Sequence, residues 1–532
     1  MKNKITIGTR GSELALWQAN YIHRKLAEVN VEAEIKVIST KGDQVQDLSF
    51  DKMEGKGFFT KEIEEALIKK EIDLAVHSHK DLETAQPKGL VIAAATTREE
   101  ANDVLLIHKK GFDQKRKLSL KQSALVGTSS ARRKSLLKGF RKDVEIKDLR
   151  GNVPTRIEKL RNGEYDAIVL AAAGINRLEA DISDLHLVSL DPTDFIPAPA
   201  QGVLALQIRE DDQELREVIS QLNDEDSNKV SSIERQVLAA FDGGCQLPIG
   251  VYCCWDEDEE KHKIWTAVSK SWKSPPQFIY METSNPSTIA SRIKEKFKNI
   301  QPTTVYITRD IRPDDCFETV LTANGFQVEG KSLIETKRVE IIKEPRPYSW
   351  VFFSSKQAIW HFFKQSKCAD EIKYGVIGKS TAEALRKHDK KPDFIGYSTD
   401  TRLTGRQFAA TVGSGRVLFP QARGSMRAIQ QQFINQEQVI DLAVYETISH
   451  AEVEIAAAEI LVFTSPSNVV AYFKRNKIKQ DQKVIAMGHA TGKALKNYNV
   501  HQFTTPASFM DTGLAAAVFL VSTYKKHHDT ET

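Results

Sequence analysis

Short apolar runs alternate with stretches in which apolar residues recur at helical spacing, and this alternation predicts an α/β fold. A second series of strands and helices begins near Asp103. The strands predicted in the first part of the chain are Lys4–Gly8, Glu34–Ile38, Ile72–Val76, Leu90–Ala95, Leu125–Gly127, Val144–Leu149 and Asp166–Ala172. The predicted helices begin after Ser12, at Thr60, after Thr128–Ser130 and around Pro154, where hydroxyl caps or a first-turn proline favour a helix start.

The pattern changes after this series. The proline-rich segment Asp191–Gly202 is predicted to return the chain to the first domain. A helix over Val230–Phe241, a glycine-rich turn over Asp242–Gly250 and strands around the acidic turn Asp256–Glu260 then indicate a third unit. The polar segment Lys41–Lys56 is predicted to be a long mobile loop, of the kind that is often a lid or is simply disordered.

A fresh strand at Val305–Thr308 begins the second half, which contains an internal repeat offset by 110 residues. Phe353-Ser354-Ser355 corresponds to Phe463-Thr464-Ser465, and the glycine that follows lies 25 residues later in both copies. The repeat predicts two similar α/β lobes. The hydroxyls at the strand-to-helix turns are equally compatible with helix caps and with sites where backbone amides bind carboxylates.

Composition limits the class of protein. A chain of 532 residues with 41% hydrophobic and 27% charged residues is typical of a soluble protein with about three to five domains. The net charge of +4 argues against attraction of the whole protein to nucleic acid or membrane. The start lacks the apolar core of a signal peptide, and the apolar run Leu514–Val521 is too short to span a bilayer, so we expect a cytoplasmic protein.

Candidate chemistry concentrates where predicted strands end. Lys80 and Asp81 follow the apolar run that starts at Ile72, and ligands of open α/β sheets bind just beyond the carboxyl ends of strands. Arginines share this placement, at a strand end or in the helix that follows: Arg10, Arg132, Arg133, Arg150, Arg156 and Arg177. Guanidinium groups in one region suit the bidentate binding of carboxylates or phosphates, although single surface arginines are usually only solvated.

Other ligands are disfavoured. No Walker A motif, no GxGxxG after a strand and no basic stripe with interleaved aromatics is present, so we expect no nucleic-acid partner. His77 and His79 would share a strand face as two metal ligands, but no third is evident nearby, so no metal is expected. The glycines before Cys245 expose its sulfur and make it available for covalent attachment, whereas a lone cysteine is more often buried and inert.

Several ordered motifs resemble hydroxymethylbilane synthase, also called porphobilinogen deaminase, from Lys4 to about Lys270. They are GTRGSELALWQA, GKGFFTKEIE, AVHSHKDL, VGTSSARR, LRGNVPTR, NGEYDAIVLAAAGINRL, PAQG and GGCQLPIG. Two positions depart from the family pattern. Leu82-Glu83 stands where the family has a proline at the second position, and Arg98-Glu99-Glu100 stands in place of Arg-Glu-Asp.

The resemblance implies a role for each strand-end residue. Cys245 would carry a dipyrromethane cofactor in thioether linkage, which primes the head-to-tail addition of four porphobilinogen units. Asp81 would hold the pyrrole nitrogens and assist the loss of ammonia and each new bond. The cofactor's acetate and propionate groups would be held by Lys80, Ser129, Arg132 and Arg133. The incoming substrate would be bound by Arg10, Ser12, Arg150 and Arg156, and Arg177 would assist the growing chain.

The second half, from Thr304 to about Phe519, is similar to uroporphyrinogen-III synthase, through the two repeat copies and Val444-Tyr445-Glu446-Thr447. The resemblance implies that Tyr445 helps to expel the hydroxyl of hydroxymethylbilane, and a tyrosine that only packs between lobes is an equal alternative. Such a chain would make hydroxymethylbilane and close it to uroporphyrinogen III with inversion of the last ring.

The two resemblances together imply the fold class. The N-terminal half would have two α/β lobes like those of periplasmic binding proteins plus a small α+β third domain, and the C-terminal half two further α/β lobes. The predicted boundaries are 1–98 with 195–220, 99–194, 221–300, 301–340 with 450–532, and 341–449. We expect a monomer. The rival hypotheses are an active deaminase with a degenerate C-terminal half, and a non-enzymatic anion-binding protein.

Overall fold

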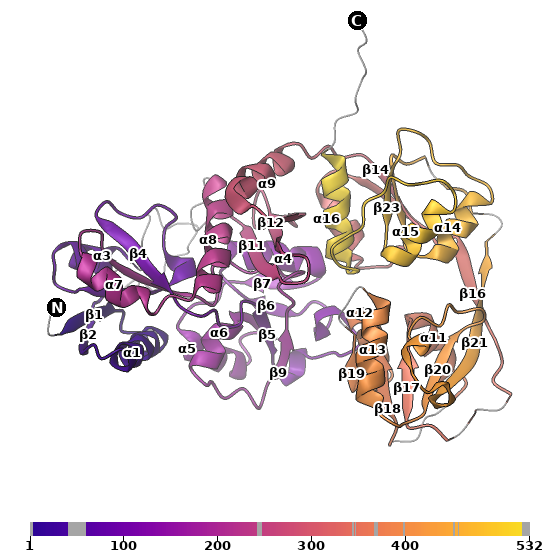
Figure 1. The fold of residues 1–532 in the computed structure, drawn as a ribbon, viewed down its shortest axis with the longest axis horizontal. Helices are drawn as coiled ribbons and strands as arrows, with labels where there is room; N and C mark the ends of the chain where they lie inside the picture. The colour runs from indigo at the N-terminus through magenta and orange to yellow at the C-terminus, as the bar shows by residue number, and fades with distance from the viewer. Residues whose placement is uncertain are drawn as a thin grey trace, which may run out of the picture. The chain divides into compact units, whose positions relative to one another are not determined.

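A computed structural model describes residues 4–40, 60–241, 247–342, 345, 347–366, 371–396, 400–450, 453–455 and 457–523. The chain divides into two compact units. Unit 1 contains Met1–Pro302, Asp314–Phe326 and Asp511–Thr532, and unit 2 contains Thr303–Pro313 and Gln327–Met510. Figure 1 shows the elements of both. The α/β fold class is confirmed, whereas the domain boundaries within it stay predictions.

The first sheet of unit 1 has the strand order β2-β1-β3-β10-β4. Its strands are β1 (Ile5–Thr9), β2 (Ala33–Val37), β3 (Leu74–Ser78), β4 (Leu90–Ala95) and β10 (Leu204–Arg209). The helices of this region are α1 (Glu13–Glu28), α3 (Lys61–Ile68) and α7 (Gln213–Ser220). β1 runs parallel to β2 and β3, and β10 runs antiparallel to β3 and β4. Because β10 follows the segment Asp191–Gly202, the predicted return of the chain to the first sheet is confirmed.

The second sheet has the order β7-β6-β8-β5-β9. Its strands are β5 (Asp103–Ile107), β6 (Leu125–Gly127), β7 (Glu145–Lys147), β8 (Ala167–Ala171) and β9 (His186–Ser189). The helices between them are α4 (Ala131–Phe140), α5 (Val153–Arg161) and α6 (Ala172–Arg177). β6 is parallel to β7 and β8, but β5 is antiparallel to β8.

The third sheet is a meander of β11 (Ile249–Asp256), β12 (Lys261–Val268) and β13 (Gln277–Thr283). Helices α8 (Glu225–Ala240) and α9 (Ile289–Lys298) lie against it (Figure 1). Unit 1 also includes α10 (Cys316–Ala323) and α16 (Asp511–Ser522), and α16 packs along β13.

Unit 2 contains two sheets, ordered β15-β14-β22-β23 and β16-β21-β20-β17-β18-β19. The first has β14 (Thr304–Ile307), β15 (Gln327–Gly330), β22 (Ile460–Phe463) and β23 (Lys483–Ala486). The second has β16 (Ile334–Arg338), β17 (Trp350–Phe353), β18 (Lys373–Val376), β19 (Phe394–Ile395), β20 (Val417–Ala422) and β21 (Val439–Ser449). The helices are α11 (Lys356–Phe363), α12 (Lys379–Arg386), α13 (Thr401–Val412), α14 (Pro466–Phe473) and α15 (His489–Lys496).

The predicted repeat of unit 2 is confirmed element by element. β17, α11, β18 and α12 recur as β22, α14, β23 and α15, each 110 residues later. Ser355 and Ser465 occupy the same place in the two copies. Each caps the helix that follows, by accepting a hydrogen bond from the backbone amide three residues on.

Most predicted elements agree with the structure, and two predictions about the central strand were wrong: where it ends, and that His77 and His79 share one of its faces. The apolar run was expected to stop before His77, but β3 extends to Ser78 because antiparallel pairing with β10 continues to that residue. His79 is beyond the strand, in the short 3-10 helix η2 (His79–Asp81), so His77 and His79 do not share one strand face. The predicted loop Lys41–Lys56 lies outside the described residues.

Candidate functional site

The strand directions of unit 1 place the predicted site residues at the ends of its first two sheets. In the first sheet, β1 and β3 are parallel, so Arg10 and Ser12 leave the same edge as Lys80 and Asp81. In the second sheet, β6, β7 and β8 point the same way. The residues that follow them therefore share one edge: Ser129, Arg132, Arg133, Arg150, Arg156 and Arg177.

The centre of the second edge is a buried carboxylate, Asp103, which is fully shielded from solvent. Arg132 donates from Nη1 to Oδ2 at 2.8 Å, and Arg133 donates from Nη2 and Nε to Oδ1 at 2.7 and 3.2 Å. Burial alone would raise the pKa of Asp103, but the two guanidinium groups outweigh it and hold that pKa below its usual range. Asp103 is therefore ionised and fixes both arginines.

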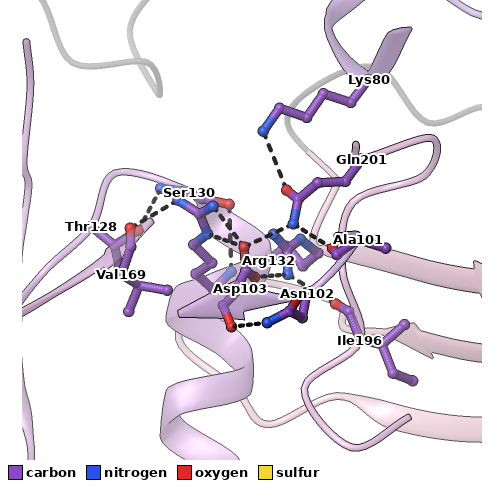
Figure 2. A network of polar contacts seen from close by, with 11 residues as sticks. Lys80, Ala101, Asn102, Asp103, Thr128, Ser130, Arg132, Val169, Ile196 and Gln201 are labelled. Carbon is purple, nitrogen blue, oxygen red and sulfur yellow. Dashed lines mark hydrogen bonds and ion pairs between the residues drawn. The ribbon is translucent and has the colours of Figure 1, made fainter. Parts of the chain in front are cut away.

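A glutamine joins this cluster to the first sheet (Figure 2). Gln201 donates from Nε2 to Asp103 Oδ1 at 3.0 Å and to the Ala101 carbonyl at 2.7 Å. Its Oε1 accepts a hydrogen bond from Lys80 Nζ at 3.2 Å. Burial lowers the pKa of Lys80 to about 8, with Asp81 opposing that shift and Arg133 adding to it. Lys80 thus provides a cation whose charge changes just above neutral pH.

Arg156 extends the positive region. Burial lowers its pKa to about 10, and the charges that act on it are those of Arg133, Asp81 and Arg150. Its Nε donates to the Gly151 carbonyl at 2.7 Å. The structure thus brings Asp81, Lys80 and four of the six predicted arginines within electrostatic range of one another.

Hydroxyl residues of the site support the loops. Ser129 Oγ donates to the Leu149 carbonyl at 2.9 Å and accepts from the Leu149 amide at 3.1 Å, which joins the loops after β6 and β7. Ser12 Oγ accepts from the Ala15 amide at 3.3 Å and caps α1, as predicted. The caps of α4 and α5 are Ser130 and Asn152.

Arg177 differs from the other predicted arginines in its contacts. It ends α6, and its Nη2 donates to the Gly202 carbonyl at 2.6 Å. Its guanidinium lies 5.8 Å from the centre of the Trp17 ring of α1. These contacts join α6 to the first sheet region, and none of them links Arg177 directly to Asp81 or Asp103.

The two histidines before Lys80 are neutral at physiological pH. Burial lowers the pKa of His77 to about 4 and that of His79 to about 3. His77 Nε2 lies 3.1 Å from Gln207 Oε1. Over the described parts of the chain, no three or more His, Cys, Asp or Glu side chains are grouped so that they could hold a metal ion.

Sequence reasoning missed Asp103 and the network role of Gln201. Both are near the start of an antiparallel strand, Asp103 as the first residue of β5 and Gln201 just before β10. The start of an antiparallel strand meets the carboxyl ends of its neighbours, as the pairs Asp103–Ala171 and Leu204–Ser78 demonstrate. The available signal was a carboxylate opening the apolar run DVLLI, since a buried charge requires a partner.

In unit 2, Tyr445 lies in β21 and is buried among the apolar residues of that lobe. Its Oη is 3.3 Å from Ser355 Oγ, and the His361 ring stacks on its ring at a centroid distance of 5.2 Å. Burial raises the pKa of Tyr445, and the hydrogen bond with Ser355 partly opposes this shift. The phenol therefore keeps its proton to a higher pH than an exposed tyrosine does.

Cys245 lies outside the described residues, which omit 242–246. The described cysteines are Cys253, Cys254 and Cys316, and none forms a disulfide. Burial raises the pKa of Cys253 well above its usual value and that of Cys316 to about 12, so neither provides a reactive thiolate near neutral pH. Among the helices that the structure describes, none has both the length and the apolar character of a membrane span.

The fold and the first site define an α/β protein with buried arginines grouped around a buried carboxylate at the strand ends. Two protein-family models match this chain. "Porphobilinogen deaminase, dipyromethane cofactor binding domain" matches residues 5–217, and "Uroporphyrinogen-III synthase HemD" matches residues 315–516. Among curated proteins, porphobilinogen deaminase of Sulfurimonas denitrificans is 46% identical over 250 residues, which cover 47% of this chain and 78% of the relative. The probable porphobilinogen deaminase of Methanocella arvoryzae is 47% identical over 253 residues, 48% of this chain and 81% of the relative.

The chain belongs to the porphobilinogen deaminase family through its first half and carries a uroporphyrinogen-III synthase domain in its second. Among solved structures, uroporphyrinogen-III synthetase of Helicobacter pylori aligns with 16% identity and a TM-score of 0.32, over 41% of this chain and all of that one. The periplasmic VFT2 domain of Bordetella pertussis BvgS aligns with 13% identity and a TM-score of 0.28, over 45% of this chain and 93% of that one.

Proposed function

We propose that this chain catalyses two consecutive reactions of tetrapyrrole biosynthesis. The first half condenses four porphobilinogen molecules head to tail into hydroxymethylbilane, with loss of ammonia. The second half closes hydroxymethylbilane to uroporphyrinogen III with inversion of the last ring. We further propose that the protein acts as a cytoplasmic monomer.

The observation that carries the first reaction is the buried Asp103 network. Two guanidinium groups share one carboxylate there, and Lys80 and Arg156 add positive charge close by. Positive groups therefore outnumber carboxylates, which suits ligands that bear an acetate and a propionate on every ring. A dipyrromethane carries the same groups, so this donor set fits the cofactor that the matched family domain binds.

The individual roles proposed here are those that the resemblance to the deaminase family implies. Arg132, Arg133, Lys80 and Ser129 would hold the carboxylates of the cofactor, which provides the end onto which the first porphobilinogen is added. The side chains proposed for the carboxylates of each incoming porphobilinogen are Arg10, Ser12, Arg150 and Arg156, with Arg177 assisting the growing chain. Asp81 is exposed at the end of η2, where its carboxylate would pair with the pyrrole nitrogens and stabilise positive charge as ammonia leaves.

Cys245 is the proposed attachment point of the cofactor, through a thioether bond to Sγ. The high pKa values of Cys253 and Cys316 support this choice, because they leave fewer competing thiolates. For the second reaction, Tyr445 is the proposed proton donor to the departing hydroxyl. Its raised pKa supports that role, since the phenol keeps its proton at neutral pH.

The decisive experiment supplies purified full-length protein with porphobilinogen, oxidises the products and separates the uroporphyrin isomers. We expect predominantly isomer III, because the second half should convert hydroxymethylbilane before it closes spontaneously. Isomer I alone would contradict the second activity and leave the first. Absence of porphyrin from folded protein would contradict both and favour an anion-binding protein.

Covalent attachment is tested by the intact mass of the purified protein. We expect the wild type to be heavier than the bare polypeptide by one dipyrromethane, and Cys245→Ser to have the bare mass. Cys254→Ser is the matched control, since Cys254 is half-buried in β11 and should leave the added mass in place. Added mass on Cys245→Ser would contradict the assignment.

A further inference from the structure

Two helices that follow residue 310 in the chain are parts of unit 1. Helix α10 and the first half of α16 lie within the segment 315–516 matched by the synthase family, yet both helices pack in unit 1 with the deaminase elements. Residues of α16 are buried over nearly its whole length, which is typical of a helix enclosed on all sides. It packs along β13 and against α10, and α10 in turn packs against α4.

The first turn of α16 is fixed to the deaminase by two polar contacts. Thr512, which is 3% exposed, donates from Oγ1 to Asp194 Oδ1 at 2.5 Å. Asp511 Oδ2 lies 3.5 Å from Lys117 Nζ, and this ammonium is 5.3 Å from the centre of the Phe140 ring in α4. Both contacts are made to residues of the deaminase half.

Asp194 lies on the segment that also supports the site. Its neighbour Phe195 packs against Phe140 of α4 at a ring distance of 5.8 Å. One residue further, the Ile196 carbonyl accepts a hydrogen bond from Arg132 Nη1 at 2.8 Å. The contact at Thr512 is therefore two residues along the chain from a direct partner of Arg132.

A second set of contacts holds the other end of α4. At Gly139, an added Cβ would lie 3.2 Å from Val320 Cγ2 of α10, so the two helices approach closely there. Lys142, just beyond α4, pairs with Glu318 of α10 at 3.0 Å. Helix α4, which carries Arg132 and Arg133 near its start, is thus contacted by α10 near its end.

We propose that Thr512 is a positioning residue for the deaminase reaction, and that it acts through Asp194 and Ile196 on the guanidinium of Arg132. A residue from the synthase half of the sequence thereby supports the site of the first reaction, and the two halves are not independent modules. This inference rests on the proposed function of that site.

The test compares Thr512→Val, which keeps the side-chain shape and removes the hydroxyl, with Thr512→Ser, which restores it. The measured quantity is the rate of hydroxymethylbilane formation per molecule that carries the cofactor, with loading determined from intact mass. We expect Thr512→Val to lower this rate by roughly three- to tenfold, in line with the partial loss of one charge-assisted hydrogen bond. Thr512→Ser should recover most of it.

The matched control is Thr411→Val, which removes a hydroxyl that bonds only within helix α13 of unit 2. It should leave the rate unchanged. A merely structural role of Thr512 would reduce the number of loaded molecules and leave the rate per loaded molecule as in the wild type, and that result would overturn the inference. Equal losses in the serine and valine variants would overturn it too. Wild-type protein that forms no hydroxymethylbilane would instead overturn the proposed function, and the inference with it.

Discussion

Arg133 Nη2 lies 2.7 Å from Asp103 Oδ1, and the two residues are 30 positions apart in the chain. The pair joins α4, which follows a parallel strand, to the first residue of an antiparallel strand. Asp103 also bonds Arg132 and Gln201, so one buried carboxylate orients three side chains at once. Its loss should therefore affect stability and cofactor binding together.

Asp103→Asn should reduce the free energy of unfolding by about 3–5 kcal/mol, because it leaves two buried guanidinium groups without their counter-charge. The measurement is urea unfolding of the full-length protein, with intact mass to determine cofactor loading. Asp258→Asn, in the exposed turn between β11 and β12, is the control and should change neither quantity. Unchanged stability and loading in Asp103→Asn would refute the orienting role.

The pKa of Asp103 also fixes the sign of a pH effect. Its folded-state pKa is below its unfolded value of about 3.9, so its contribution to stability is complete above that value and is lost as the pH falls further. Asp103→Asn should therefore lose less additional stability than the wild type below about pH 4. Parallel acid-unfolding curves for the two proteins would contradict this expectation.

Lys80 should introduce a loss of activity at alkaline pH. Its pKa of about 8 means that the ammonium, and with it the proposed hold on a carboxylate, is lost as the pH rises through that value. A bound carboxylate raises this pKa, so the fall in kcat/KM should begin at or above about pH 8. Lys80→Arg keeps its charge and should move the fall to higher pH. An identical alkaline limb in both proteins would exclude Lys80 as its origin.

The lowered pKa of Lys80 also makes the free energy of unfolding depend on pH, and here stability rises as the pH rises. Since the folded-state pKa of Lys80 is below its ordinary value of 10.5, the unfolded chain binds more protons between about pH 8 and 10.5. The free-energy cost of burying Lys80 is therefore largest below about pH 8 and smallest at the alkaline end of that window. Lys80→Met should remove this dependence, which urea unfolding at several pH values would detect.

Local pattern was sufficient to predict much of the fold. The capping hydroxyl of Ser12, the strand Leu90–Ala95 and the 110-residue repeat were all readable because each depends on nearby residues. The helices that carry Arg132 and Arg156 were predictable for the same reason, because caps and a first-turn proline mark their starts.

The features that the sequence did not predict depend on pairing between strands that are far apart in the chain. The extension of β3 to Ser78 depends on β10, which is more than a hundred residues later, and no local signal marks it. Asp103 and Gln201 reach the site because their strands run antiparallel, a direction that the apolar pattern does not encode. The packing of α16 along β13 likewise depends on tertiary contacts, since its sequence indicates only a buried helix.

The repeat of unit 2 provides a matched pair of cap variants. Ser355→Ala and Ser465→Ala each remove the side-chain cap of a corresponding helix and should each cost about 1 kcal/mol of stability. Only Ser355 also contacts Tyr445, at 3.3 Å. Cyclisation, followed as the ratio of isomer III to isomer I, should therefore suffer more in Ser355→Ala. Equal ratios at equal stability loss would mean that the contact with Tyr445 has no catalytic value.

Tyr445→Phe separates the two roles proposed for this residue, because it keeps the ring that stacks on His361 and removes the phenolic hydroxyl. If the phenol donates to the departing hydroxyl, formation of isomer III should slow by about tenfold or more. Tyr472→Phe in α14 is the control, since burial raises the pKa of that phenol as well and the residue lies in the other repeat copy. Because the pKa of Tyr445 is raised above 10, no loss of cyclisation from its ionisation should occur near neutral pH. A Tyr445→Phe enzyme with the wild-type rate of isomer III formation would establish that the ring acts by packing alone.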